Sequence, residues 1–159
     1  MTVEVVSRPR GPAEDADLQK LVNIHGKREG LEDWATTVTL KVVAPQLWWR
    51  QVTEYFSEIE WLRAHPDEDP EHRQIEMSDF EEPVGDQIIK RLNDHIRKKE
   101  RRALAMLLPE SFIRHGLIQT NIAVIRDIIK ERGHYQTGHW HVFCDQIRSN
   151  RTLRSYLDR

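Results

Sequence analysis

The chain has 159 residues, about the length of one domain. Charged residues make up 31% of it, yet the net charge is only −2, so both signs are interspersed and a nucleic-acid-binding surface is not expected. The single cysteine, Cys144, excludes an internal disulfide, and no apolar run nears the roughly 18 residues of a membrane span. The first residues show no secretory signal, so we expect a cytoplasmic protein.

The first 45 residues predict two strands and one helix. Residues 2–6 are typical of a short strand, and residues 15–25 carry apolar side chains at helical spacing. Residues 35–43 alternate between polar and apolar side chains, which favours a half-buried strand ended by Ala44 and Pro45.

A helix is predicted over residues 46–65, where an apolar stripe recurs with the period of an α-helix. A tryptophan lies among charged residues on another side of this helix, which suggests either a subunit interface or a stacking platform for a flat ligand. The side chains that project together there are Arg50, Gln51, Glu54, Glu58 and Trp61.

The second half of the chain is expected to be mostly helical. Residues 66–83 are acidic and interrupted by prolines, which predicts an exposed loop. A long helix is predicted over residues 84–108, with Ile88 and Leu92 facing inward and Pro109 ending it.

Two further helices are predicted after Pro109. The first covers residues 118–132, with isoleucines at helical spacing and Gly133 as its C-cap. The last covers residues 140–156 and should bury Trp140, Phe143, Cys144 and Ile147.

Metal binding and hydrolysis receive little support from residue spacing. His134, His139 and His141 lie near Cys144, but they match no established zinc-ligand spacing. Glu54 and Glu58 are four residues apart, as in all-helical, metal-dependent nucleotide pyrophosphohydrolases, but Asp86 and Asp94 supply no convincing second pair. We assign no catalytic residue and no metal site.

Asn121 and Arg132 are eleven residues apart on the helix predicted over 118–132. On an α-helix they would lie on one side and roughly 16 Å apart along the axis, the separation of a dinucleotide-sized ligand. Geometry alone leaves chance placement as the alternative.

Four segments together resemble the flavin-dependent thymidylate synthases, over roughly residues 35–150. In that family a strand ends in Ala-Pro and an Arg-Gln pair follows after four residues, as in the segment that ends at Arg50 and Gln51. The other segments are residues 107–109 with Thr120, Asn121 and Arg132; Phe80-Glu81-Glu82-Pro83; and residues 139–144, in which the chain is similar to the short branch of the family found in phages.

The resemblance implies an α+β fold that is mostly helical, with a small antiparallel sheet packed with long helices in a single domain over residues 1–159. It implies that Gln51 contacts a pyrimidine nucleotide, that Asn121 contacts flavin, and that Arg132 lies between the two ligands. It also implies a homo-oligomer, a tetramer or dimer, whose active sites are shared between subunits, and FAD as the cofactor.

The family's signature after the Arg-Gln pair is Arg-His-Arg, and here those places hold Glu54, Tyr55 and Phe56. Replacing a guanidinium by a carboxylate beside phosphates exchanges attraction for repulsion, so flavin and dUMP binding of the family's kind should fail. Tyr55 is a residue expected in the phage-type branch. The interface or ligand face is therefore assigned to Arg50, Glu54, Tyr55, Glu58 and Trp61.

Three functions remain open. The first is a phage-type relative that has lost dUMP methylation and binds a nucleotide or a protein partner, such as a component of a host defence system. The second is an active flavin- or nucleotide-dependent enzyme with a rewired site. The third is an unrelated helical protein, including a pyrophosphohydrolase.

Overall fold

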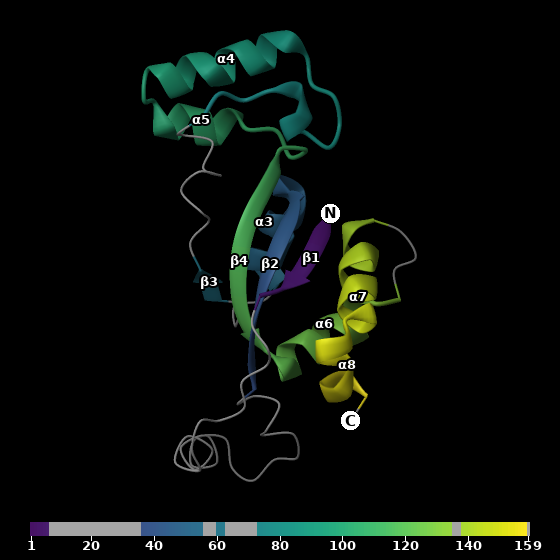
Figure 1. Ribbon diagram of the computed structural model, residues 1–159. Coiled ribbons are helices and arrows are strands. Elements are labelled where there is room, and N and C mark those ends of the chain that lie inside the picture. Colours follow the sequence, from purple (N-terminus) through teal and green to yellow (C-terminus); the bar gives the residue numbers. More distant parts are fainter. Residues whose placement is uncertain (7–35, 56–59, 63–72, 135–137, 159) are drawn as a thin grey trace.

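The computed structural model describes residues 1–6, 36–55, 60–62, 73–134 and 138–158. A sheet runs along the middle of the molecule (Figure 1), with the pair α4 (Asp86–Arg97) and α5 (Arg101–Leu107) at one end and helices of the C-terminal third beside the sheet and toward its opposite end. The helix expected over residues 15–25 lies outside the described residues. Within them, no helix has the length and apolar character needed to cross a membrane.

The sheet is antiparallel, with the order β1 (Thr2–Val5), β2 (Thr37–Pro45), β4 (Ile113–Asn121), β3 (Glu60–Leu62). The strands expected near residues 2–6 and 35–43 are confirmed as β1 and β2. From Thr37 to Ala44 the even-numbered side chains of β2 are buried and the odd-numbered ones are half-buried, as the alternation predicts. The fold is α+β with a small antiparallel sheet, which confirms the predicted class.

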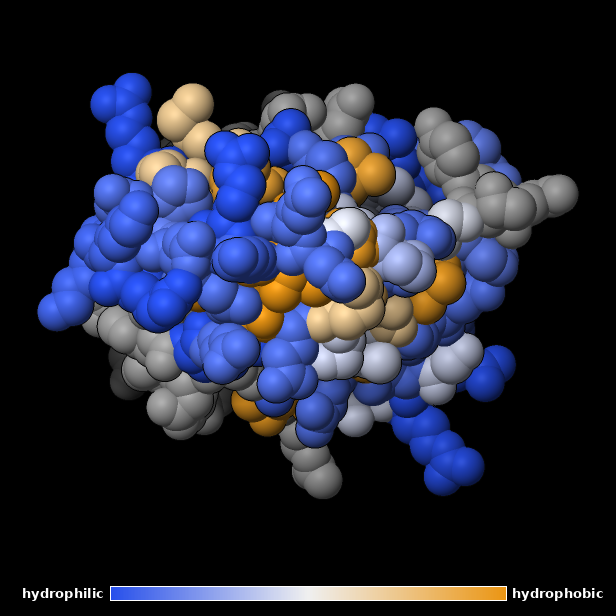
Figure 2. All heavy atoms as spheres, turned by 90° about the horizontal axis from the view of Figure 1, so that it is seen from above, coloured by the Kyte–Doolittle hydropathy of each residue, from blue (hydrophilic) through white to orange (hydrophobic). Residues whose placement is uncertain are grey.

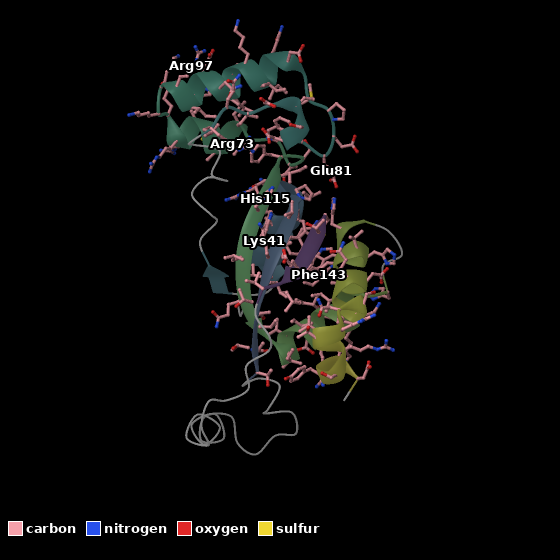
Figure 3. The ribbon with its side chains drawn as sticks, in the orientation of Figure 1. Lys41, Arg73, Glu81, Arg97, His115 and Phe143 are labelled. Carbon is pink, nitrogen blue, oxygen red and sulfur yellow. The ribbon has the colours of Figure 1, made fainter. Side chains whose placement is uncertain are left out.

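The main core lies on one face of the sheet. Apolar residues of α3 (Gln46–Tyr55), α6 (Ile122–Arg132), α7 (His139–Ser149) and α8 (Arg151–Leu157) pack there against β2 and β4. Phe143 points from α7 toward the sheet (Figure 3) and is 1% exposed. The inward positions predicted for the last helix are all buried: Trp140, Phe143, Cys144 and Ile147.

A second core lies at the α4–α5 end. It joins Ile75 and Phe80 to Leu92 of α4, Leu104 of α5 and Phe112. Seen from above, this end presents mainly hydrophilic side chains, with apolar ones showing between them (Figure 2). The second core explains why α4 and α5 fold against each other.

The predicted loop over residues 66–83 is described from residue 73 onward. That part is irregular apart from the 3-10 turn Met77–Asp79, and it buries Ile75 and Phe80. The Asn93 side chain accepts from the Ile75 N–H at 2.8 Å and donates to the Ile75 carbonyl at 2.9 Å. This part of the segment is therefore held firmly against α4.

Arg73 and Asp79 form a two-pronged ion pair within the same segment, with both N–O distances 2.7 Å. Burial alone would raise the pKa of the Asp79 carboxyl. The hydrogen bonds from Arg73 and from the Glu76 N–H, with the positive charges of Arg73 and His115, outweigh burial and hold that pKa below its usual range. The carboxylate in turn raises the pKa of Arg73.

The helix predicted over residues 84–108 is wrong in its continuity. It divides into α4 and α5, and Lys99 between them has a φ of 57°. Ile88, expected inward, is 36% exposed, whereas Leu92 is fully buried. The division lets Leu92 and Leu104 enter the same core, a packing gain that outweighs continuing a helix with good local propensity.

Three other helix boundaries also differ from the predictions. Residues 60–62 form β3 instead of continuing the helix that begins at Gln46. The segment before residue 122 is strand β4, so α6 begins four residues later than predicted, while Gly133 is its C-cap as expected. The last predicted helix divides at Asn150, whose side chain caps α8 by accepting from the Thr152 and Leu153 N–H groups.

Candidate functional site

The structure brings Gln51 and Arg132 together around Trp140. The Trp140 indole Nε1–H donates to Gln51 Oε1 at 2.8 Å, across 89 positions of sequence. The Arg132 guanidinium carbon lies 5.6 Å from the centre of the Trp140 ring, within cation–π range. Three helices thus contribute one residue each: Gln51 from α3, Arg132 from the end of α6 and Trp140 from the start of α7.

Local packing positions these three residues. The first turn of α3 is tied to the start of β4, because the Gln46 N–H donates to the Phe112 carbonyl at 2.8 Å. Trp48 is 1% exposed and packs against Trp140, with the ring centres 5.3 Å apart and the rings tilted by 47°. Since Trp48 lies one turn before Gln51, this packing helps to position both Gln51 and Trp140.

The polar atoms of this site suit a planar anionic ligand. Because the Gln51 oxygen is occupied by the indole N–H, the amide nitrogen is the group that remains to donate to a ligand carbonyl. Arg132 contributes a permanent positive charge with a planar set of donors, which matches a phosphate. Both side chains are half-buried, so their interactions are less screened by water than those of fully exposed groups.

Two other residues of the predicted interface or ligand face, Arg50 and Trp61, lie away from Gln51. Arg50 points toward Glu110, with an N–O distance of 2.6 Å. Trp61 lies in β3, paired with Ile118 of β4, because the helix ends before it. Glu54 and Tyr55 are in the last turn of α3, and Glu58 lies outside the described residues. Trp61 therefore does not project from the same helix as Arg50, and for Glu54, Tyr55 and Glu58 the interface or ligand face stays a prediction.

Asn121 occupies a different environment from the one predicted. It is the last residue of β4 and the N-cap of α6, and its Oδ1 accepts from the Val124 N–H at 2.9 Å. Asn121 and Arg132 consequently mark the two ends of α6, instead of facing out from one side of a longer helix. The capping role accounts for an asparagine at this position without a ligand.

The histidines near Cys144 make contacts with carboxylates. His139 lies 2.8 Å from both oxygens of Glu81, which Figure 3 shows on the side of the α4–α5 end nearest α7. His141 is 3.2 Å from Asp145 one turn along α7. Across residues 1–6, 36–55, 60–62, 73–134 and 138–158, no three or more His, Cys, Asp or Glu side chains are grouped to hold a metal. Cys144 is fully buried, and burial raises the pKa of its thiol.

Trp140 is the residue of this site that sequence reasoning placed only in the core. It is 8% exposed, so its core assignment is confirmed, but its indole N–H faces Gln51. The available signal was its place in the segment 139–144, which carries part of the family resemblance. Glu81 pairs with His139 and so links the α4–α5 end of the molecule to α7. It also lies in one of the segments that carry the family resemblance, Phe80-Glu81-Glu82-Pro83.

Two solved structures share this fold. Thymidylate synthase X (ThyX) from Helicobacter pylori, with FAD and dUMP, aligns with a TM-score of 0.58 and 8% identity, over 91% of this chain and 82% of that chain. The UMP/dUMP methylase PolB from Streptomyces cacaoi, bound with 5-Br UMP, aligns with a TM-score of 0.51 and 12% identity, over 85% and 77%. No protein-family model matches the sequence, and no curated protein matches it.

These similarities confirm, at the level of the fold, the resemblance to flavin-dependent thymidylate synthases predicted from the sequence. The antiparallel sheet contradicts the all-helical fold that the third possible function, an unrelated helical protein, would require.

Proposed function

We propose that this protein binds a pyrimidine nucleotide through Gln51 and Arg132 and does not methylate it. The observation that carries the proposal is the meeting of these two residues on Trp140, although they come from different helices. The amide nitrogen would donate to a pyrimidine carbonyl and the guanidinium would pair with the phosphate. The nucleotides named with the two structurally similar proteins, dUMP and 5-Br UMP, belong to this class.

We propose that the protein does not hold FAD as a cofactor in the manner of the family it resembles. Asn121, the residue expected at the flavin, uses its side-chain oxygen to cap α6. Arg132, expected between flavin and nucleotide, lies on Trp140 at the other end of that helix. The sequence Glu54, Tyr55, Phe56 in place of Arg-His-Arg lacks the two arginines of that signature. These observations support binding without catalysis.

We also propose that the protein is a homo-oligomer, a tetramer or dimer, of a phage-type branch, and that its nucleotide-bound form acts on a protein partner such as a host defence component. The nucleotide is the ligand for which contacting side chains can be named, so it is the part to test first. Sedimentation of the purified protein would measure the oligomeric state, and a monomer at micromolar concentration would contradict the assembly.

The test is calorimetric titration of the purified protein with dUMP and with UMP. We expect Gln51→Ala and Arg132→Ala each to weaken binding about tenfold or more, because each removes a hydrogen-bonding or charged contact from a half-buried site. Arg50→Ala is the matched control, since Arg50 is the neighbour of Gln51 but faces Glu110. Thermal melting would show that each variant is folded.

Three results would contradict the proposal. If the protein bound neither dUMP nor UMP, the proposed nucleotide binding would be wrong and a protein partner would be the next ligand to test. Equal affinity in wild type and in both variants would place the nucleotide elsewhere. Visible flavin absorbance in the purified protein, together with nucleotide-dependent oxidation of the reduced flavin, would instead support the alternative of an active, rewired flavin enzyme.

A further inference from the structure

A hollow with a volume of about 810 Å³ lies among the three C-terminal helices α6, α7 and α8. Four of its lining side chains are basic, and among the described lining residues Asp158 supplies the carboxylate. The cations come from all three helices: Arg126, Lys130, Arg148 and Arg154. The protein as a whole has a net charge of −2, so this concentration of positive charge does not follow from composition.

Three of these cations are held by neighbouring groups. Arg126 donates to the Tyr156 carbonyl of α8. Arg148 of α7 donates to the Gly133 carbonyl at the end of α6, at 3.5 Å. Arg154 Nε lies 3.3 Å from Asp158 Oδ2, one turn along α8. Contacts of this kind reduce the side-chain freedom that a ligand would otherwise have to freeze.

Gly133 makes room for one of the cations. A Cβ atom at this position would lie 2.2 Å from Nη2 of Arg148 and 2.3 Å from the Ile129 carbonyl oxygen, so the guanidinium could not remain where it is. A glycine therefore allows Arg148 to lie directly over the end of α6. The backbone of Gly133 has φ −71°, so space and not backbone conformation is the reason for glycine here.

Gathering like charges costs folding free energy, and a bound anion would relieve that cost. Arg126 and Lys130 are four residues apart on α6, a spacing at which like charges repel. Ion pairing accounts for Arg154, and helix capping together with an ion pair to Asp145 at 3.9 Å accounts for Arg148. Neither contact explains why both arginines line the same hollow as Lys130. The volume falls within the range of small-molecule sites, and Ile129 and Leu157 add apolar surface to its wall.

We propose that this hollow binds a small polyanion with two or more phosphate groups, either free polyphosphate or a nucleoside polyphosphate. Arginine guanidinium groups recognise phosphate oxygens with paired donors, and Lys130 adds a point charge. In a nucleoside polyphosphate, the base would contact Ile129 and Leu157. The site does not depend on the pyrimidine nucleotide site, because Gln51, Arg132 and Trp140 are not among its lining residues.

The test compares sodium tripolyphosphate, ATP and inorganic phosphate by calorimetric titration at constant ionic strength. We expect tripolyphosphate and ATP to bind at least about tenfold more tightly than inorganic phosphate, because several phosphates contact several cations at once. Tighter binding of ATP than of tripolyphosphate would identify a nucleoside polyphosphate. Equal binding of the two would identify the polyphosphate chain alone as the ligand chemistry.

The variants are the double substitution Lys130→Gln and Arg154→Gln, with Arg151→Gln as the matched control. Arg151 is an exposed cation of α8 that does not line the hollow. We expect the double variant to lose at least about tenfold in tripolyphosphate affinity, and the control to bind like wild type. Gln51→Ala should also bind tripolyphosphate like wild type, which separates this site from the proposed nucleotide site.

Two kinds of result would overturn the proposal. One is tripolyphosphate binding that is absent, no tighter than that of inorganic phosphate, or unchanged in the double variant. The other is binding of a single-stranded oligonucleotide through Lys130 and Arg154 without binding of tripolyphosphate, which would make the hollow part of a nucleic-acid surface.

Discussion

The packing of Trp49 against Gly116 can be tested by adding one methyl group. A Cβ at Gly116 would lie 2.7, 3.1 and 3.4 Å from Cη2, Cζ2 and Cζ3 of Trp49, so the ring must move. The ring has little room, because Trp49 is 2% exposed and its Nε1–H is shared between the Ala44 carbonyl at 3.1 Å and the Arg114 carbonyl at 3.2 Å. The methyl group therefore tests a contact that cannot relax cheaply.

We expect Gly116→Ala to lower the free energy of unfolding by about 1–2 kcal/mol. Overpacking a core costs about 1–3 kcal/mol, and replacing a strand glycine by alanine returns up to about 1 kcal/mol. The ring centres of Trp49 and Trp48 are 5.0 Å apart, and those of Trp48 and Trp140 are 5.3 Å apart. Because Trp140 belongs to the proposed nucleotide site, displacement of Trp49 should also weaken nucleotide binding. Urea unfolding followed by tryptophan fluorescence measures the first effect, and calorimetry measures the second.

A double-mutant cycle with Trp49→Phe provides the control. The three close atoms of Trp49 belong to the six-membered ring that extends beyond a phenyl group, so in this background the added methyl should cost much less. A coupling energy of about 1 kcal/mol or more between Gly116→Ala and Trp49→Phe is expected. A Gly116→Ala variant within about 0.5 kcal/mol of wild type would refute the reasoning.

Further expectations concern stability and reactivity. Asp79→Asn should destabilise the protein by about 1–2 kcal/mol at neutral pH, through loss of charge-assisted bonds to Arg73. Because the pKa of Asp79 is lowered on folding, its contribution is fully present above an unfolded value of about 3.9 and is lost as pH falls through the lower pKa of the folded state. The stabilities of variant and wild type, measured by acid unfolding, should therefore converge only below that folded-state pKa. Asn121→Ala should cost about 1 kcal/mol by removing the cap of α6, while Asn121→Asp should retain stability in urea unfolding. Cys144 should react with a thiol reagent in denaturant but not in the native protein, because burial raises its pKa and blocks access; fast native labelling would contradict this.

Local sequence patterns were enough to predict the elements in which buried side chains recur at a regular spacing and whose ends carry a glycine or proline. The alternation in residues 37–43 identified β2, because each apolar side chain there enters the same core face. Gly133 identified the end of α6, and the apolar spacing of Trp140, Phe143, Cys144 and Ile147 identified the buried face of α7. Ordered short motifs also pointed to the fold that ThyX and PolB share.

Tertiary structure decided the boundaries that local propensity does not mark. Ile118 continues the helical spacing of Ile122 and Ile125, yet it belongs to β4, because nine consecutive residue pairs with β2 form there. The turn at Lys99 carries no glycine or proline, and it forms because Leu92 and Leu104 must reach one core.

The candidate site was predicted as separate residues and not as an arrangement. Gln51 and Arg132 were named from the family resemblance, but their meeting on Trp140 spans 89 positions in sequence and three helices. The cationic hollow among α6, α7 and α8 is a similar case, since its arginines look like ordinary surface residues along the chain. Side chains distant in sequence become neighbours only when the helices pack on the sheet, and that packing is a property of the whole chain and not of any local segment.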